Sequence, residues 1–225
     1  MFVLYLDPFH LGDPLFATSL ARDLRARLDA GGGGLVIVHG TGEAGERAIE
    51  ALGEEPIREG GALTLDSVRA ATEAERAGRD ENRRLVDTLN EAGVPAVRVL
   101  ASDRGLVQPD GSMERSQWVR DLASRGAVPV VLAFRAGGDD PPRDLDPAAL
   151  AAELAGSLGN LPVFALTSRA VETGTDPVAW RDVPVPDTEA LARIGFGGAR
   201  LLAGRRAAIR VPGDPEGVQV AVEGT

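Results

Sequence analysis

The stretch that decides the fold is Leu35-Val36-Ile37-Val38-His39-Gly40-Thr41-Gly42. It opens with a short apolar run rich in β-branched residues, which is typical of a strand buried on both faces. The glycines that follow predict a tight turn into a helix, and Gly53 predicts where that helix stops. A buried strand followed directly by a helix is the repeating unit of a parallel sheet covered by helices.

The same alternation extends from this stretch toward both ends of the chain. Apolar runs predict further strands at Phe2–Leu6, Ala96–Leu100, Val128–Phe134, Val163–Leu166, Ala208–Val211 and Val218–Val222. Amphipathic stretches predict helices from Pro14 onward and over about Ser67–Ala77, Asp80–Ala92, Arg115–Ser124, Pro147–Gly159 and Asp187–Ile194. The sequence contains no repeat and no low-complexity linker, so we expect one continuous structural unit over residues 1–225.

Turn and capping residues refine this pattern. Asp13 and Asp146 are each followed by a proline, which predicts an N-cap and a first helical residue at both places. The dipeptide Asp110-Gly111 predicts a turn between two short strands. The polar residues Arg135–Arg143 predict a loop.

Composition restricts the classes of function. The chain has 34 acidic and 24 basic residues and a net charge of -10, which opposes binding to a nucleic acid backbone. It has no cysteine and only two histidines, His10 and His39, so we expect no disulfide and no metal site. No stretch approaches the roughly 20 apolar residues of a membrane helix, and Met1–Asp7 lacks the charge pattern of a secretory signal. We therefore expect a cytoplasmic protein without a membrane partner.

One feature of the composition bears directly on chemistry. Every basic residue is arginine, and the chain contains no lysine. A genomic bias toward arginine codons would explain this without any functional cause. Whatever the origin, no mechanism that needs a lysine ammonium group is available to this chain.

Several segments, taken in order, carry a family resemblance. They are Leu35–Gly42, Asn82–Asn90, Ala96-Val97 with Asp103, Gly126–Val131 and Asp144–Ala149. Together they resemble the acetylglutamate and acetylaminoadipate kinase branch of the amino-acid kinase superfamily. The resemblance implies a three-layer α/β/α sandwich with a mainly parallel central sheet. It also implies that residues 1–143 form the substrate and dimer side and residues 144–225 a shortened nucleotide side.

The chain departs from this family where phosphate chemistry takes place. The stretch Tyr5-Leu6-Asp7-Pro8 stands where the family has Lys-x-Gly-Gly, so tyrosine replaces the lysine, and an acid and a proline replace the flexible glycines. Leucine stands at the place of the substrate-binding arginine, within Gly61–Leu65, although Arg58 is close enough in sequence to substitute. Ala148 replaces the organising aspartate, Ser168 ends the nucleotide-side turn, and the second family lysine has no counterpart.

The surviving site residues are His39, Gly40, Thr41, Gly42 and Asn82. A glycine-rich turn at a helix N-terminus can bind an anion, so these residues are candidates for an anion or substrate site. The alternative is structural: any tight turn uses glycine, His39 fits a satisfied strand-end residue, and Asn82 a solvated polar residue. We predict no catalytic residue.

Three hypotheses for function stay open. The first is a pseudokinase that acts as a binding, regulatory or assembly partner and has no cofactor. It would pair with a second copy of itself or with an active kinase paralogue, or bind a small acidic metabolite. The second is a divergent kinase that uses ATP and magnesium to phosphorylate the carboxylate of an N-acylated amino acid, such as acetylglutamate or a carrier-linked aminoadipate. The third is different chemistry on the old cleft, which convergence of Asp7, His10 and His39 would favour.

The resemblance also implies a homodimer. Its interface would use the helix Glu43–Leu52 and the segment up to Ala77, where Val68, Ala71 and Ala74 recur at helical spacing. The alternative is that this face packs on its own sheet.

Overall fold

The computed structural model describes residues 1–6, 11–29, 31, 33–59, 61–137, 142–159, 161, 163–166, 172–173, 176–177, 182–183, 206–210 and 218–221. The predicted helix Asp187–Ile194 lies outside these residues. So do Asp7, Pro8, His10 and Ser168, so the structure does not test the predictions that depend on them.

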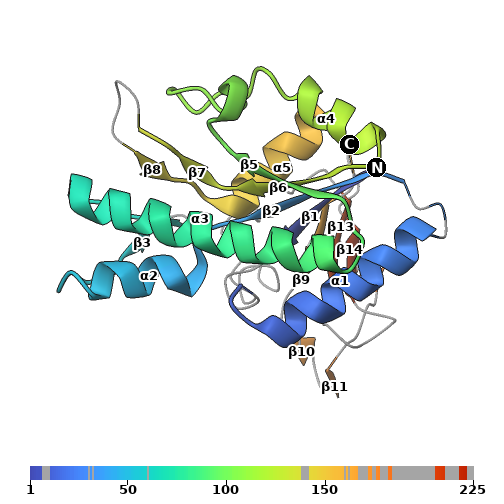
Figure 1. Cartoon of the computed structure of the whole chain (residues 1–225), viewed down its shortest axis with the longest axis horizontal. Coiled ribbons are helices and arrows are strands. Elements are labelled where there is room, and N and C mark those ends of the chain that lie inside the picture. Colours follow the sequence, from blue (N-terminus) through green and yellow to red (C-terminus); the bar gives the residue numbers. More distant parts are fainter. Residues whose placement is uncertain are drawn as a thin grey trace.

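An eight-stranded sheet forms the centre of the molecule (Figure 1), with the strand order β12-β14-β13-β9-β1-β2-β6-β5. The strands are β1 (Phe2–Leu6), β2 (Leu35–His39), β5 (Ala96–Leu100), β6 (Val128–Leu132), β9 (Val163–Leu166), β12 (Asp182–Val183), β13 (Arg206–Arg210) and β14 (Val218–Ala221). Neighbouring strands are parallel except for β13 and β14. The predicted mainly parallel sheet is confirmed.

Helices cover both faces of this sheet. On one face lie α1 (Pro14–Asp29) and α3 (Val68–Glu91), and on the other lie α4 (Gln117–Ser124) and α5 (Pro147–Ser157). In β2, Leu35 and Ile37 join the apolar cluster under α1 and α3, whereas Val36 and Val38 join the cluster under α4 and α5. Because both faces are covered, the strand is apolar throughout, and the three-layer prediction is confirmed.

The first helix begins as its sequence predicts. The backbone N–H of Leu15 donates to Asp13 Oδ1 at 2.9 Å, and Pro14 is the first helical residue. Phe16, Leu20 and Leu24 recur every four residues, and each is buried against the sheet.

Helix α3 corrects one prediction. It runs without a break from Val68 to Glu91, where the sequence predicted two helices separated near Gly78. Gly78 packs so closely against other elements that a Cβ atom there would lie 2.9 Å from Thr41 Cγ2. This glycine therefore permits a close approach of α3 to the sheet instead of ending the helix.

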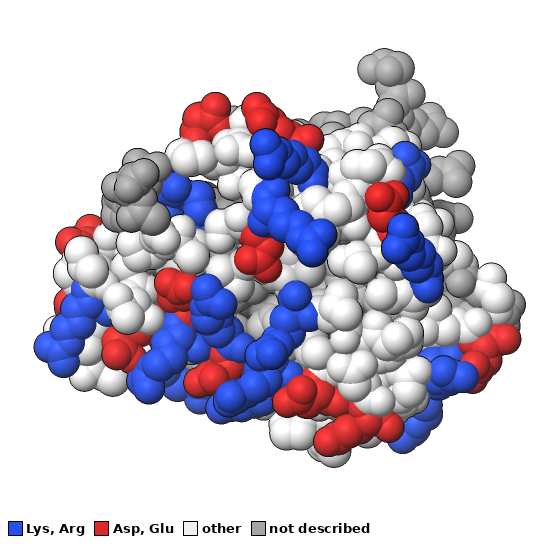
Figure 2. Space-filling view, turned by 45° about the horizontal axis from the view of Figure 1, so that its top comes forward, with Lys and Arg blue, Asp and Glu red and all other residues white. Residues whose placement is uncertain are grey.

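The outer side of α3 is polar. Arg76, Arg79 and Arg83 pair with acidic residues three or four positions earlier on the same helix. Figure 2 shows acidic and basic side chains intermixed over this side of the molecule.

The segment Arg135–Arg143, predicted as a polar loop, begins and ends in two short strands that pair with each other. Strand β6 stops at Leu132, two residues earlier than predicted, and β7 (Phe134–Arg135) pairs antiparallel with β8 (Arg143–Asp144). A second hairpin, β3 (Arg58–Glu59) with β4 (Ala62–Leu63), was not predicted. Two-residue strands are too short to show a period in the sequence.

The turn at Asp110-Gly111 forms, but the two strands predicted around it do not. The N–H of Gln108 donates to the carbonyl of Ser112 at 2.8 Å, and Gly111 has a φ of 87°. A 3₁₀ turn, Asp103–Gly105, occupies the segment that precedes it.

Across the part of the chain that is described, no helix has the length and apolar character needed to cross a membrane.

Replacing Gly78 with valine tests the close approach of α3. We expect Gly78→Val to lower the free energy of unfolding by about 2 kcal/mol, because its methyl groups would displace Thr41 and Leu132. Arg76→Val, on the exposed side of the same helix, is the control and should cost under about 1 kcal/mol. Urea unfolding measures both, and equal losses would contradict the packing role.

Candidate ligand-binding site

The predicted site residues His39–Gly42 lie at the carboxyl end of β2, the edge where ligands bind in open α/β sheets, and Asn82 contacts them from α3. His39 is the last residue of β2 and is fully buried. Asn82 of α3 donates from Nδ2 to His39 Nε2 at 2.9 Å and to the carbonyl of Val130 at 3.0 Å. His39 Nδ1 lies 2.8 Å from the carbonyl of Gly40, so the ring proton is on Nδ1. His39 and Asn82 thus join α3 to the sheet.

Burial also fixes the charge of His39. It lowers the pKa of the imidazole to about 4, although the hydrogen bond to Gly40 acts in the opposite direction. The ring is therefore neutral at physiological pH, and both of its nitrogens are hydrogen bonded within the protein. That arrangement agrees with the structural interpretation of His39; the anion site at His39–Gly42 stays a prediction.

The glycine turn is shaped by close packing. Thr41 precedes α2 (Gly42–Glu50) and is fully buried, but its hydroxyl does not cap the helix. Instead, Oγ1 donates to Asp144 Oδ1 at 3.4 Å. Gly42 has a φ of 64°, and a Cβ atom on Gly40 would lie 3.2 Å from Pro147. The turn therefore needs glycine for its conformation and for its contact with α5.

Asp144 is a site residue that the sequence did not single out. Its carboxyl group is almost fully buried and accepts a 2.7 Å hydrogen bond on Oδ2 from the backbone N–H of Leu63. Burial raises its pKa to about 7, although the bonds from Leu63 and Thr41 and the nearby Arg58 oppose that rise. Asp144 thus connects β8, the β3–β4 hairpin and the glycine turn.

Arg58, the suggested substitute for the family arginine, is engaged within the protein. Its guanidinium donates to Glu46 at 2.5 Å and to the carbonyls of Gly61 and Gly42 at 3.0 and 3.2 Å. It also lies 3.8 Å from Asp144. These contacts anchor the hairpin to α2.

Asp146 caps α5 as predicted, because its Oδ1 accepts a 2.9 Å hydrogen bond from the N–H of Ala148. Burial raises the pKa of this carboxyl. The turn of the β3–β4 hairpin packs against Asp146. Gly61 in this turn has a φ of 91°, and a Cβ atom there would lie 2.6 Å from Asp146 Oδ1. Asp146 therefore supports the hairpin as well as the helix.

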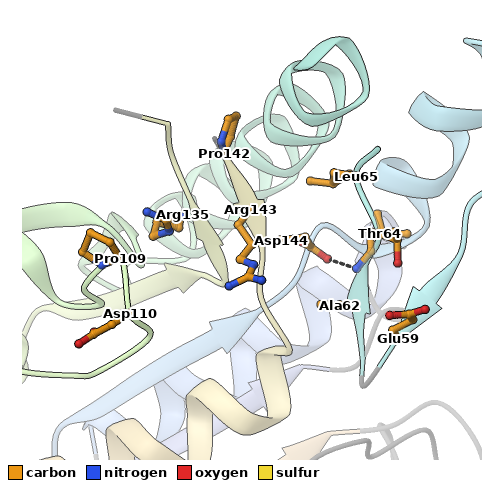
Figure 3. Close-up of a pocket in the computed structure, with 11 residues that line it drawn as sticks. Glu59, Ala62, Thr64, Leu65, Pro109, Asp110, Arg135, Pro142, Arg143 and Asp144 are labelled. Carbon is orange, nitrogen blue, oxygen red and sulfur yellow. Dashed lines mark hydrogen bonds between the residues drawn. The ribbon is translucent and has the colours of Figure 1, made fainter. Parts of the chain in front are cut away.

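A cavity of about 800 Å³ opens beside this network (Figure 3). It is lined by Glu59, Ala62, Leu63, Thr64, Leu65, Pro109, Asp110, Arg135, Pro142, Arg143 and Asp144. Figure 3 shows Arg143 extending from β8 into the space between the Pro109-Asp110 turn and the β3–β4 hairpin. The cavity has the size of a small-molecule site.

Two arginines give this cavity its chemical character. Arg135 and Arg143 stand directly opposite each other in the β7–β8 pair, an arrangement in which like charges repel. Arg135 is buried and Arg143 is exposed. Both residues line the cavity, where guanidinium groups favour an anionic ligand. The sequence predicted both residues only as the ends of a polar loop and did not place them at a cavity.

Known structures share this architecture. One is N-acetylglutamate synthase from Neisseria gonorrhoeae, complexed with coenzyme A and N-acetyl-glutamate. The match covers 100% of this chain and 60% of the synthase, with a TM-score of 0.76 and 19% sequence identity. The match to aspartate kinase from Synechocystis covers 100% of this chain and 40% of that kinase, with a TM-score of 0.69 and 16% sequence identity. The match to isopentenyl phosphate kinase from T. acidophilum covers 94% of this chain and 91% of that kinase, with a TM-score of 0.63 and 16% sequence identity.

At these identities the likeness establishes the fold alone. The chain has the amino-acid kinase fold, as the resemblance of its sequence implied. It spans about three fifths of the length of the synthase that it matches. No protein-family model matches the sequence, and neither does any curated protein.

The buried Asp144 and His39 should make stability depend on pH in opposite directions. Between its unfolded value of 3.8 and its folded pKa of about 7, Asp144 holds a proton only in the folded state, so stability falls as pH rises. Between about 4 and 6.5, His39 holds a proton only in the unfolded state, so stability rises with pH.

We therefore expect Asp144→Asn to remove the first effect and leave the second. The wild type should lose at least about 1 kcal/mol relative to this variant between pH 5 and pH 8. Urea unfolding across that range measures the difference, with Asp121→Asn as an exposed control. Parallel pH profiles for the wild type and Asp144→Asn would contradict the buried, proton-holding carboxyl.

Proposed function

We propose that this chain is an amino-acid-kinase-fold binding or regulatory protein that does not transfer phosphate. The observation that carries the proposal is the absence of lysine from the whole sequence. Phosphoryl transfer depends on positive charge placed around the transferring group. Arginine does not replace a lysine point charge without a change of geometry.

The glycine turn offers additional support. Asp144 lies directly behind Thr41, within 3.4 Å of its hydroxyl. When ionised, a buried carboxylate at this position repels a phosphate at the start of α2, because charges interact strongly where water is excluded. The fold does not argue against the proposal, since one of the structures with this fold is a synthase.

The proposed ligand is a small acidic metabolite in the 800 Å³ cavity. Arg135 and Arg143 would bind its carboxylate, and Leu63 and Leu65 would contact its apolar part. Glu59 and Asp110 at the same cavity favour a ligand that also carries a hydrogen-bond donor. We also propose a cytoplasmic location.

The arginine pair is the one observation that favours the alternative, a divergent kinase that phosphorylates a carboxylate such as that of acetylglutamate. In that case Arg135 and Arg143 would supply the charge that lysines supply in the family, together with ATP and magnesium.

Calorimetry with magnesium ATP separates the two functions. We expect no binding tighter than about millimolar, which corresponds to roughly -4 kcal/mol. An active amino-acid kinase, titrated in the same buffer, is the positive control. A micromolar dissociation constant together with phosphate transfer to acetylglutamate would establish the alternative.

We also propose that the chain forms a homodimer, or pairs with an active kinase paralogue, through α2 and the start of α3. Ala71 and Ala74 are buried within their own chain, so they are not the contact surface. Val68, the first residue of α3, is 73% exposed, and Ile57, just before β3, is 48% exposed, so both large apolar residues are available for contact.

Sedimentation at micromolar concentration tests the pairing. We expect a mass near twice 23.5 kDa, reduced by Val68→Arg and unchanged by Leu15→Arg, which alters an equally exposed apolar residue elsewhere. A monomeric wild type would exclude the homodimer and leave only the paralogue.

A further inference from the structure

A second cavity, of about 350 Å³, lies between α1 and α3, two helices that contact each other at an inclined angle (Figure 1). Its lining residues are Leu6, Leu11, Gly12, Asp13, Pro14, Phe16, Ala17, Glu81, Arg84, Leu85, Asp87, Thr88 and Glu91. None of them lines the 800 Å³ cavity. The function proposed above therefore leaves this cavity unexplained.

The inner wall of the cavity is apolar and firmly packed. Leu6, Leu11, Phe16 and Leu85 belong to the cluster that joins α1 and α3 to the sheet, and each is buried. Such a wall is preformed, because moving it would disturb the core. It favours a ligand with an apolar body.

The rim of the cavity carries excess negative charge. Glu81 is neutralised by Arg84 at 2.6 Å, and Asp13 caps α1. Asp87 and Glu91 are exposed, and neither forms an ion pair with any residue that the structure describes. They stand four residues apart on α3, where like charges repel each other.

A cation at this rim would therefore relieve a repulsion that the fold leaves unbalanced. A metal ion does not fit, since no group of three or more acidic or histidine side chains among the described residues could hold one. An anion would be repelled. The acidic rim and the apolar wall together favour a positive group joined to an apolar body of modest size.

We propose that the cavity between α1 and α3 binds a small organic cation, with its apolar body against Phe16 and Leu85 and its ammonium group beside Asp87 and Glu91. The site is independent of the proposed pseudokinase function and of the first cavity.

Hexylammonium chloride is a suitable probe, with hexanol and hexanoate as neutral and anionic analogues of the same length. Calorimetry on the full chain at low salt should show saturable binding of one hexylammonium per chain, weaker binding of hexanol and none of hexanoate. Asp87→Asn with Glu91→Gln should weaken the cation by about five- to ten-fold and leave hexanol unchanged. Both changes are on the surface, so the fold should persist.

The matched control is Glu55→Gln with Glu114→Gln, which removes two exposed charges elsewhere. It should leave the affinity for hexylammonium unchanged. The proposal is overturned if hexylammonium shows no saturable binding at about 10 mM, well above a millimolar dissociation constant. It is also overturned if hexanol binds as tightly, or if the control weakens binding as much as the rim variant.

Discussion

The buried carboxyl group of Asp144 connects the elements around the candidate site. It accepts hydrogen bonds from the backbone N–H of Leu63 and from the hydroxyl of Thr41, and it lies 3.8 Å from the Arg58 guanidinium. Arg58 in turn holds Gly61 and Gly42 by their carbonyls. A buried carboxyl is costly unless such partners surround it. The β3–β4 hairpin, the glycine turn and β8 are therefore held in one arrangement, and that arrangement forms one side of the larger cavity.

The same network bears on the chemistry of the glycine turn. A turn that opens a helix presents backbone N–H groups to an anion, but here a carboxyl group lies behind it. Positive charge in the larger cavity comes instead from Arg135 and Arg143 of the β7–β8 pair. For this reason we propose the anion site beside the β7–β8 pair and not at the turn itself. This shift of positive charge distinguishes the cavity from a phosphate site built on lysine and glycine.

Much of the fold could be predicted from the sequence, because its signals are local and strong. Strands β1 and β2 are apolar runs whose residues are all buried, and the caps Asp13 and Asp146 each precede a proline. The error at Gly78 arose because a glycine that permits packing and a glycine that ends a helix look alike in one sequence. Only the contact with Thr41 and Leu132, far away in the chain, distinguishes the two cases.

The site was predicted less well than the fold, for a related reason. His39 and Asn82 were recognised because motifs carry them, but their mutual hydrogen bond depends on the docking of α3 onto the sheet. Asp144, Arg135 and Arg143 lie in strands of two residues, which leave no period to detect. What brings them to the cavity is the burial of Asp144 and Arg135 and the pairing of β7 with β8, and both are properties of the folded chain.

Helix α3 lies near both cavities, because it lines the 350 Å³ cavity and contacts β8, which lines the larger one. Asn82 binds His39 beneath the glycine turn, and its neighbour Glu81 lines the cavity beside α1. The helix is continuous through Gly78, so a displacement at one of these residues moves the other. A ligand in one cavity changes the other only if α3 can adopt two positions and the ligand binds the protein more tightly in one of them. The tight contact of Gly78 with Thr41 and Leu132 opposes a second position, so the two cavities should bind their ligands independently.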